Sequence, residues 1–521
     1  MQPTEAAVNQ GESAARLPAR WVHWVSLLLL LVAGIVVRLV GLARKPFWFD
    51  ECFSVEVARL GWRNFLHLLW WREANMSLYY LLLRIWLRFG QREFYVRSLS
   101  VVFAAATLPA IYWLARLLYD RRVAWIAAAL FAFNAYSVRY AQEARSYALF
   151  LLLATLSSGF LVAFLRAPTH RNRIAYVAVS VLGVYAHFYA LLLIAAHGLA
   201  LRWLGSSGLD GDQPIMQPSA RMRRAWIAIS LAVLPLLVFV AKTGAGPIRW
   251  IQRPNLRDVL EFYQHLAGGT NWVLPAICGL ACMAAVIPHG KQLLARNQPR
   301  ETWRIQFLLI WLFFPVVLTV LLSFARPVFL GRYMIFCLPA LLILVAAGLA
   351  RVRQPWLLAG TLAGILSLCS QGIFFVYGHD FDHERDASGA AADFILEHTQ
   401  PGDAVVFHIA ETRIPYEFFR SLRAGENTAS PDFTGQFGPE ILFPQHGAGL
   451  DYRDFTGKPT ADFLHTAAPN HPRVWVMLMN NGSAEKPDPT TVMLTNILPE
   501  SLPKVQSWQF TKVEVRLYSR E

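Results

Sequence analysis

The chain has 521 residues, of which 55% are hydrophobic, 13% aromatic and 16% charged, and its mean hydropathy is +0.37. A soluble domain carries about 25% charged residues, so this composition excludes a cytosolic enzyme, a disordered tail and a secreted disulfide scaffold. The length exceeds that of one ordinary core. We therefore expect a polytopic membrane protein with a water-facing appendage.

The formal net charge is +14, but the cations do not lie along one polar face. Because no basic stripe with interleaved stacking aromatics is present, nucleic acid is not an expected partner. Many cations flank apolar runs instead, where Lys and Arg orient membrane helices among the lipids. The five cysteines form no Cys-x-x-Cys pair, so the sequence predicts neither a zinc site nor a disulfide framework, and we expect no metal or other cofactor.

A helix needs about 20 apolar residues to cross the hydrocarbon core of a membrane. The first such run, Trp21–Ala43, follows a polar leader at residues 1–20 that we place in the cytoplasm. No small-residue cleavage site follows the run, so we expect a retained helix and not a signal peptide. Ten further runs are candidate spans: Phe94–Leu118, Val123–Val138, Ser146–Leu165, Ile174–Ala186, Phe188–Leu204, Ala225–Ala241, Trp272–Pro288, Trp303–Phe324, Val328–Ala350 and Trp356–Val376.

Two stretches leave the topology open, and each would invert every later segment. Leu78–Phe89 is apolar but short, and the distribution of arginines favours a position flat on the membrane surface. Ile174–Leu204 is too long for one span and barely long enough for two, and the same rule favours two. Eleven spans then put the N-terminus in the cytoplasm and make residues 44–93 the first outer loop, with interfacial helices.

Residues 378–521 are polar, rich in Asp, Pro and Gly, and contain no run of membrane length. They are predicted to form an outer α/β domain of ordinary size. Residues 423–472 show no clear periodicity and are expected to be a loop. The predicted elements are helices over Asp386–His398 and Ile414–Leu422 and strands over Ala404–Ile409, Arg473–Met479 and Lys512–Ser519.

Adjacent carboxylates, Asp50 and Glu51, follow the first span directly after Trp48 and Phe49. Aromatic residues anchor at headgroup depth, where a lipid phosphate also lies. Asp50 is therefore placed to take a proton from an incoming nucleophile as a general base. The alternative is that both acids only begin an amphipathic helix over Cys52–Leu60.

The other candidate site residues are predicted to lie on the same face as Asp50. Glu143 and Arg145 occupy a short outward loop before Tyr147, where they either bind a sugar hydroxyl and a phosphate or form an ordinary snorkelling pair. His187 lies at an outer turn, where a structural role is the alternative. Arg332 and Tyr333 lie at the outer end of the tenth span, where Arg either snorkels or binds an anionic headgroup.

A further outward helix is expected after Asn255, with Asp258 completing a capping box, and it would border a cleft. The middles of the spans are almost free of charge. A transporter would bury polar groups at mid-span in both halves of the chain. The sequence therefore favours chemistry at the membrane surface over passage through it.

The order and spacing of these motifs resemble a known family. The resemblance is carried by Asp50-Glu51, by residues 75–83 leading to Trp86, by Phe94–Ser100, by Tyr140–Tyr147 and by Arg332-Tyr333. Together they are similar to the protein O-mannosyltransferase and aminoarabinose-transferase branch of the GT-C membrane glycosyltransferases (glycosyltransferase family 39-like). The similarity covers residues 38–350 and is strongest over 47–148.

The resemblance implies transfer of a sugar from a polyprenyl-phosphate donor to an acceptor, without metal, at the outer face of the bacterial inner membrane. Asp50 would be the base and Glu51 would support it or contact substrate. Arg145 and Arg332 would stabilise the leaving phosphate. The other expected substrate-binding residues are Glu143, Tyr147, His187 and Tyr333.

The chain departs from the family at Asn75-Met76-Ser77, where relatives usually have His-Pro-Pro, so acceptor preference does not transfer. The acceptor, whether lipid, glycan or protein, stays unknown. Two other functions are possible interpretations of the same sequence. One is a flippase or transporter of lipid-linked sugar, and the other is a non-catalytic assembly subunit.

Overall fold

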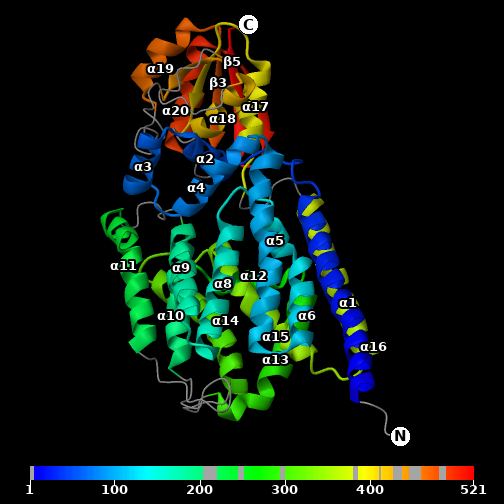
Figure 1. Ribbon diagram of the computed structural model, residues 1–521. Helices are drawn as coiled ribbons and strands as arrows, with labels where there is room; N and C mark the ends of the chain where they lie inside the picture. Colours follow the sequence, from blue (N-terminus) through cyan, green and yellow to red (C-terminus); the bar gives the residue numbers. More distant parts are fainter. Residues whose placement is uncertain are drawn as a thin grey trace.

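The computed structural model describes residues 5–202, 220–243, 251–293, 300–378, 385–409, 412–425, 437–444, 459–479 and 488–520. A helical bundle carries an α/β domain at one end, and three short helices, α2 to α4, lie between the two (Figure 1). Helix α1 starts at the opposite end of the bundle from this C-terminal domain (Figure 1).

The bundle helices are α1 Glu5–Leu39, α5 Glu93–Leu118, α6 Arg121–Ala132, α7 Ala135–Ala141, α8 Tyr147–Arg166, α9 His170–Ala186, α10 Ala190–Leu201, α11 Ala220–Thr243, α12 Leu256–Ala267, α13 Val273–Val286, α14 Arg300–Ser323, α15 Leu338–Leu349 and α16 Pro355–Gly378. The short helices between bundle and domain are α2 Phe49–Arg59, α3 Trp62–Trp71 and α4 Ser77–Trp86. Short 3-10 segments are η1 Leu87–Phe89, η3 Ile287–Gln292, η4 Gly331–Cys337 and η6 Ala468–Asn470.

Within the described residues, eight helices are long and apolar enough to cross a membrane. They correspond to eight of the predicted runs, so the polytopic helical architecture is confirmed. The predicted runs Val123–Val138, Ile174–Ala186 and Phe188–Leu204 fold as shorter helices that run alongside the long ones (Figure 1). The first of these is broken because the Asn134 side chain accepts a hydrogen bond from the Ser137 amide and starts a new helix. The count of eleven spans stays a prediction.

The two ambiguous stretches form short helices, and how each of them lies in the membrane stays a prediction. Residues 174–202 form α9 and α10, joined by a turn at His187–Tyr189. Helix α4 has ten residues, so it spans only about 15 Å, half of the hydrocarbon core. It packs through Tyr79, Tyr80 and Leu83, which are buried.

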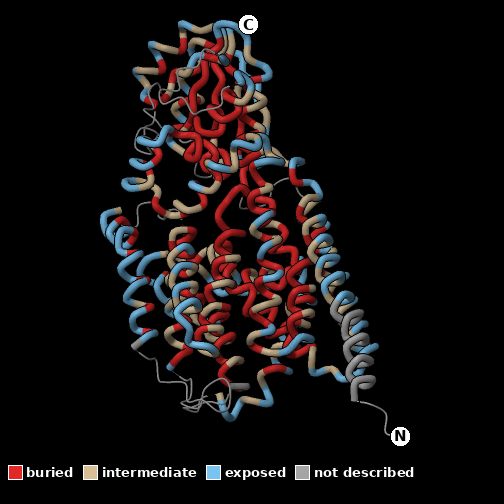
Figure 2. Tube along the Cα trace, in the orientation of Figure 1, coloured by how far each residue is buried: buried red, intermediate tan, exposed pale blue. Residues whose placement is uncertain are grey.

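Buried residues fill the centre of the bundle and of the C-terminal domain, whereas the peripheral helix α11 is mostly exposed (Figure 2). Between its charged ends, most exposed residues of α11 are apolar, for example Leu231 at 65% and Ile227 at 58%, as expected for a lipid-facing surface. At the centre, every residue of α15 is buried. A Cβ atom at Gly348 would lie 1.8 Å from the Ala281 carbonyl oxygen, so glycine lets α15 approach α13 closely.

The C-terminal domain is a five-stranded sheet in the order β2-β1-β3-β5-β4. Strand β1 pairs in parallel with β2 and β3, whereas β5 is antiparallel to β3 and β4. The elements are α17 Ser388–His398, β1 Ala404–Phe407, α18 Arg413–Arg423, β2 Glu440–Phe443, α19 Ala461–Ala467, β3 Arg473–Met479, α20 Pro489–Ser501, β4 Lys504–Phe510 and β5 Val513–Ser519.

The two faces of this sheet have different partners. Val405 and Phe407 pack with α17 and α18 in a core that continues into α2 and α4. Ala404 and Val406 pack on the opposite face with α19 and α20. One continuous apolar core therefore joins the domain to α4 and to α2, which carries Asp50, and it stabilises their relative placement.

The predicted helices and strands of this domain are confirmed with small shifts at their ends. Four elements were missed. Strand β2 and helix α19 lie within residues 423–472, which we expected to be a loop, and β2 has only four residues. Helix α20 and edge strand β4 were also not predicted, and β4 is exposed along most of its length, so it carries no apolar alternation.

Candidate active site

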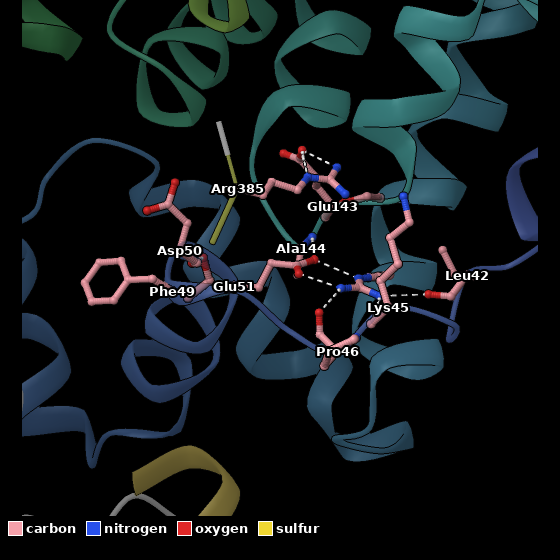
Figure 3. A network of polar contacts seen from close by, with 12 residues as sticks. Leu42, Lys45, Pro46, Phe49, Asp50, Glu51, Glu143, Ala144 and Arg385 are labelled. Carbon is pink, nitrogen blue, oxygen red and sulfur yellow. Dashed lines mark hydrogen bonds and ion pairs between the residues drawn. The ribbon is translucent and has the colours of Figure 1, made fainter. Parts of the chain in front are cut away.

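Asp50 lies in the first turn of α2, as the capping alternative requires, but its side chain faces charged partners. Adjacent helical residues point about 100° apart, so Asp50 and Glu51 enter different surroundings (Figure 3). The Asp50 carboxyl is 20% exposed, and its Oδ2 lies 3.5 Å from Arg145 Nη2 and 3.9 Å from Arg332 Nη2. The structure thus brings together three predicted site residues from distant segments.

Glu51 is buried in a fully formed set of hydrogen bonds. Its Oε1 and Oε2 accept bonds of 2.8 Å and 2.6 Å from the Arg97 guanidinium, and Oε1 also accepts a 2.8 Å bond from the Ala144 amide (Figure 3). Only 1% of its side chain is exposed. Glu51 therefore holds α2 against the loop before α8, which fits support of Asp50 better than contact with substrate.

Helix α2 is buried on all sides, so it lacks the water-facing side that the alternative of an amphipathic helix requires. Residues 51–59 are all buried, including Glu56 and Arg59, whose side chains pair at 2.7 Å. The cause is the C-terminal domain, which covers the face of α2 that would otherwise meet water. Burial raises the pKa of Glu56, and the nearby Arg59 opposes that shift.

Glu143 and Arg145 have separate partners, so they are not paired with each other. Arg385 of the C-terminal domain donates to Glu143 Oε1 from Nε at 3.0 Å and from Nη2 at 2.5 Å (Figure 3). Glu143 is 2% exposed, and burial raises its pKa while Arg385 opposes that shift. Arg385 thus occupies Oε1 of Glu143, whereas Oε2 is buried and has no hydrogen-bond partner, and the contact of Glu143 with substrate stays a prediction.

Asp50 and Arg145 face each other without an ideal ion pair. Burial disfavours the charge on Arg145, but Asp50, Tyr147 and Tyr80 together outweigh burial and raise the pKa of the guanidinium. Their 3.5 Å separation exceeds the 2.7–2.9 Å of a tight charge-assisted bond. Asp50 Oδ2 and Arg145 Nε are buried and have no hydrogen-bond partner. Both groups are thus available to a ligand.

His187 is a neutral hydrogen-bond donor that faces the same cations. Its Nδ1 accepts a 3.2 Å bond from the Tyr189 amide, so the ring proton lies on Nε2. Burial first, and then Arg145 and Arg332, lower the pKa of His187. The Nε2 atom is buried and has no hydrogen-bond partner.

Aromatic rings complete the wall of the site. The His187 ring stacks on Phe150 at 5.0 Å between centroids and lies 4.8 Å from Tyr333, whose ring stacks near Tyr147 at 6.4 Å. The hydroxyls of Tyr147 and Tyr80 are buried and have no hydrogen-bond partner. Buried polar groups are satisfied in most proteins, so a cluster of unsatisfied ones near Asp50 marks a candidate site for a polar ligand.

The segment where the chain departs from the family pattern is fastened to the His187 turn. Asn75 Oδ1 accepts a 3.1 Å bond from the Phe188 amide, and Ser77 donates to the Tyr185 carbonyl oxygen. Met76 has a φ of 64° before α4 begins. The expected helix after Asn255 is also present as α12, with both bonds of the capping box formed, and its Phe262 packs near Gly331, next to Arg332.

Three acidic or basic residues near the site were missed from the sequence. Glu73 lies between α3 and α4, where burial raises its pKa to about 7, Arg145 lowers it and Asp50 raises it further. A lone acid just before residues 75–83 was the available signal. Arg385 and Asp386 follow the last span and carry no motif. In the described part of the chain, no group of three His, Cys, Asp or Glu side chains could hold a metal ion.

Comparison with protein-family models and with curated proteins finds no match to this sequence. Solved structures do match in fold. The apo aminoarabinose transferase ArnT of Cupriavidus metallidurans has a TM-score of 0.59 and 12% identity, over 96% of this chain and 99% of that one. The chain has the GT-C fold. The expectation from the resemblance is confirmed at this level.

Two further GT-C structures describe the range of this likeness. ArnT of Cupriavidus metallidurans bound to undecaprenyl phosphate has a TM-score of 0.56 and 13% identity, over 95% of this chain and 98% of that one. The oligosaccharyltransferase of Archaeoglobus fulgidus has a TM-score of 0.50 and 11% identity, over 93% of this chain and 73% of that one. At such identities the likeness concerns the GT-C architecture alone.

Proposed function

We propose that this chain is a GT-C glycosyltransferase of the bacterial inner membrane, which moves a sugar from a polyprenyl-phosphate donor to an acceptor at the periplasmic face. The observation that carries the proposal is the Asp50 carboxylate, which faces Arg145 and Arg332. Buried polar atoms of Tyr80, Tyr147 and His187 have no hydrogen-bond partner. The undecaprenyl phosphate bound to ArnT supports a polyprenyl-phosphate donor.

In this mechanism Asp50 accepts the proton of the acceptor hydroxyl or amine. The acceptor atom forms a bond to the anomeric carbon as the bond from that carbon to the phosphate oxygen breaks, which inverts the configuration. Polyprenyl phosphate leaves with the electron pair. Because Asp50 is held at 3.5 Å from Arg145 without a tight bond, it keeps a lone pair for the incoming proton.

Charge develops on the phosphate as it leaves, and the opposite wall of the site carries the donors for it. The Arg145 and Arg332 guanidinium groups match phosphate geometry, and neutral His187 offers its Nε2 hydrogen. Preorganised donors of this kind are the largest contribution to many enzymatic rate enhancements. Tyr147 and Tyr333 provide ring faces and hydroxyls near the sugar.

The test is transfer from a panel of polyprenyl-phosphate sugars by purified protein in membranes containing envelope glycans and lipids. We expect Asp50→Asn to lose transfer while Asp393→Asn, which alters an exposed ion pair with Arg423, retains it. Wild-type-like transfer by Asp50→Asn would remove Asp50 as the base. Movement of donor across sealed vesicles without consumption of an acceptor would favour a transporter instead.

A further inference from the structure

The C-terminal domain begins with a segment that contacts both the start of α2 and the loop before α8. Arg385 contributes the two bonds to Glu143 described above. The Arg385 side chain is 7% exposed, so this ion pair is nearly dry. Arg385 therefore ties the domain to the loop that presents Arg145, two residues after Glu143.

The next residue, Asp386, caps the helix that presents Asp50. Trp48 occupies the N-cap position of α2, and it makes no side-chain cap hydrogen bond. Asp386 Oδ1 accepts a 3.3 Å bond from the Phe49 amide and a 3.0 Å bond from the Ser388 amide. A carboxylate at a helix start satisfies a free amide and is stabilised by the helix dipole. One side chain thus begins both α2 and α17.

Gly389 brings this segment against the backbone before α2. A Cβ atom at Gly389 would lie 1.9 Å from the Phe47 carbonyl oxygen, so the close approach requires glycine. The approach of Gly389 to Phe47 is not the domain's sole attachment to this region. The domain is also attached to α2 by the 2.7 Å bond from Arg59 to Ser421, and to the segment before α2 by the edge-to-face packing of Phe47 on Phe418.

Three segments, residues 49–51, 143–145 and 385–386, therefore form a closed triangle of polar contacts. The first two are joined by Glu51 to the Ala144 amide at 2.8 Å and by Asp50 to Arg145 at 3.5 Å. Arg385 joins the second to the third, and Asp386 joins the third to the first. Asp50 and Arg145 thus lie on two of the three segments, and the third segment, from the C-terminal domain, contacts both.

We propose that Arg385 and Asp386 are positioning residues of the active site, by which the C-terminal domain sets the placement of Asp50 relative to Arg145. The inference rests on the proposed function and extends it to the C-terminal domain, whose role the sequence analysis left open. A buried ion pair is a poor source of net stability, because desolvation offsets its attraction. Its effect is expected in geometry, since a misplacement of about 1 Å can cost 100-fold in rate.

The first measurement is hydrogen–deuterium exchange of the full-length protein at the amides of residues 49–52 and 143–146. Arg385→Met removes the charge but keeps most of the stem, and we expect exchange at both segments to rise by roughly threefold or more. The matched control is Arg473→Met, which breaks the 2.6 Å pair with Asp403 inside the same domain and touches neither segment. Unchanged exchange at both segments in Arg385→Met would overturn the proposal.

Conservative variants separate positioning from a general loss of folding. Arg385→Lys keeps the charge and is expected to restore part of the protection. Asp386→Asn keeps a good helix cap and should exchange like wild type at residues 49–52, whereas Asp386→Ala should not. Equal exchange in the Asn and Ala variants would contradict the capping role, whether or not Arg385→Met folds.

The second measurement is the affinity for undecaprenyl phosphate in detergent. We expect Arg385→Met to bind about tenfold more weakly than Arg473→Met. Faster exchange with unchanged affinity would overturn the claim that the segment serves the site. If wild-type protein binds no undecaprenyl phosphate, the proposed donor is wrong, and the exchange comparison still decides whether Arg385 and Asp386 position the two segments.

Discussion

Asp50 Oδ2 lies 3.5 Å from Arg145 Nη2, although the two residues are 95 positions apart in the chain. Arg145 Nη1 also lies 3.5 Å from the Asp50 carbonyl oxygen. The guanidinium therefore contacts both the backbone and the side chain of the residue that we assign as the base.

Substitution of Arg145 tests its role at the leaving phosphate. Removal of one preorganised donor from a site of developing charge costs about 100- to 1,000-fold in rate. We expect Arg145→Met to lose transfer by that factor and Arg145→Lys to lose less, because lysine keeps the charge without the planar fork. The measurement is single-turnover transfer from saturating donor. Arg423→Met, which disrupts surface ion pairs, is the control and should transfer like wild type. Equal rates for Arg145→Met and the control would exclude Arg145 from the reaction.

Glu73 predicts a specific dependence of stability on pH. Burial raises its pKa to about 7 from a usual value of 4.5, so the folded protein holds a proton that the unfolded chain releases between these values. The unfolded state then binds fewer protons, and the free energy of unfolding falls as pH rises from about 4.5 to 7. We expect the Tm of Glu73→Gln to fall less over this range than that of wild type, in scans at several pH values. Parallel pH profiles for the two proteins would contradict the raised pKa.

The positions of the membrane helices were largely predictable because apolar runs near 20 residues mark them directly. The meeting of Asp50 with Arg145 and Arg332 was also within reach, since counting spans places all three at one end of the bundle. The separate partners of Glu143 and Arg145 could not be predicted from the sequence. Glu143 turns to Arg385, which lies 242 positions away, and no local pattern reports such a distant partner.

The burial of α2 could not be predicted for a related reason. In the sequence, Glu56 and Arg59 indicate a water-facing side of the helix. In the structure the C-terminal domain covers them, through α18 residues such as Ser421. Asp386 was missed because capping normally comes from the residue just before the helix, here Trp48. Contacts between separately folded parts leave little periodic signal in either sequence.

The membrane orientation is a prediction that labelling can test. Lys504 at the start of β4 and Arg353 between α15 and α16 are both exposed, and they lie on opposite sides of the expected topology. In intact spheroplasts, the Lys504→Cys protein should react with an impermeant maleimide. The Arg353→Cys protein should react only after the membrane is permeabilised. Four of the five native cysteines are buried, so wild type is a low-background control. The reverse pattern would place the active site in the cytoplasm.

Substitution of His187 tests whether its ring acts as a neutral hydrogen-bond donor and not as a titrating acid. The lowered pKa means that the ring stays uncharged across the physiological range, so the rate of transfer should show no inflection near pH 6.5 that depends on this residue. His187→Phe keeps a flat ring against Phe150 but loses the Nε2 donor, and we expect undecaprenyl phosphate to bind more weakly by about 1–2 kcal/mol. His187→Gln retains a donor and should recover part of that loss. Both affinities are measured by titration in detergent, with thermal unfolding as the check on folding. If His187→Phe binds undecaprenyl phosphate as tightly as wild type, the histidine is only a packed ring of the core, as the structural alternative holds.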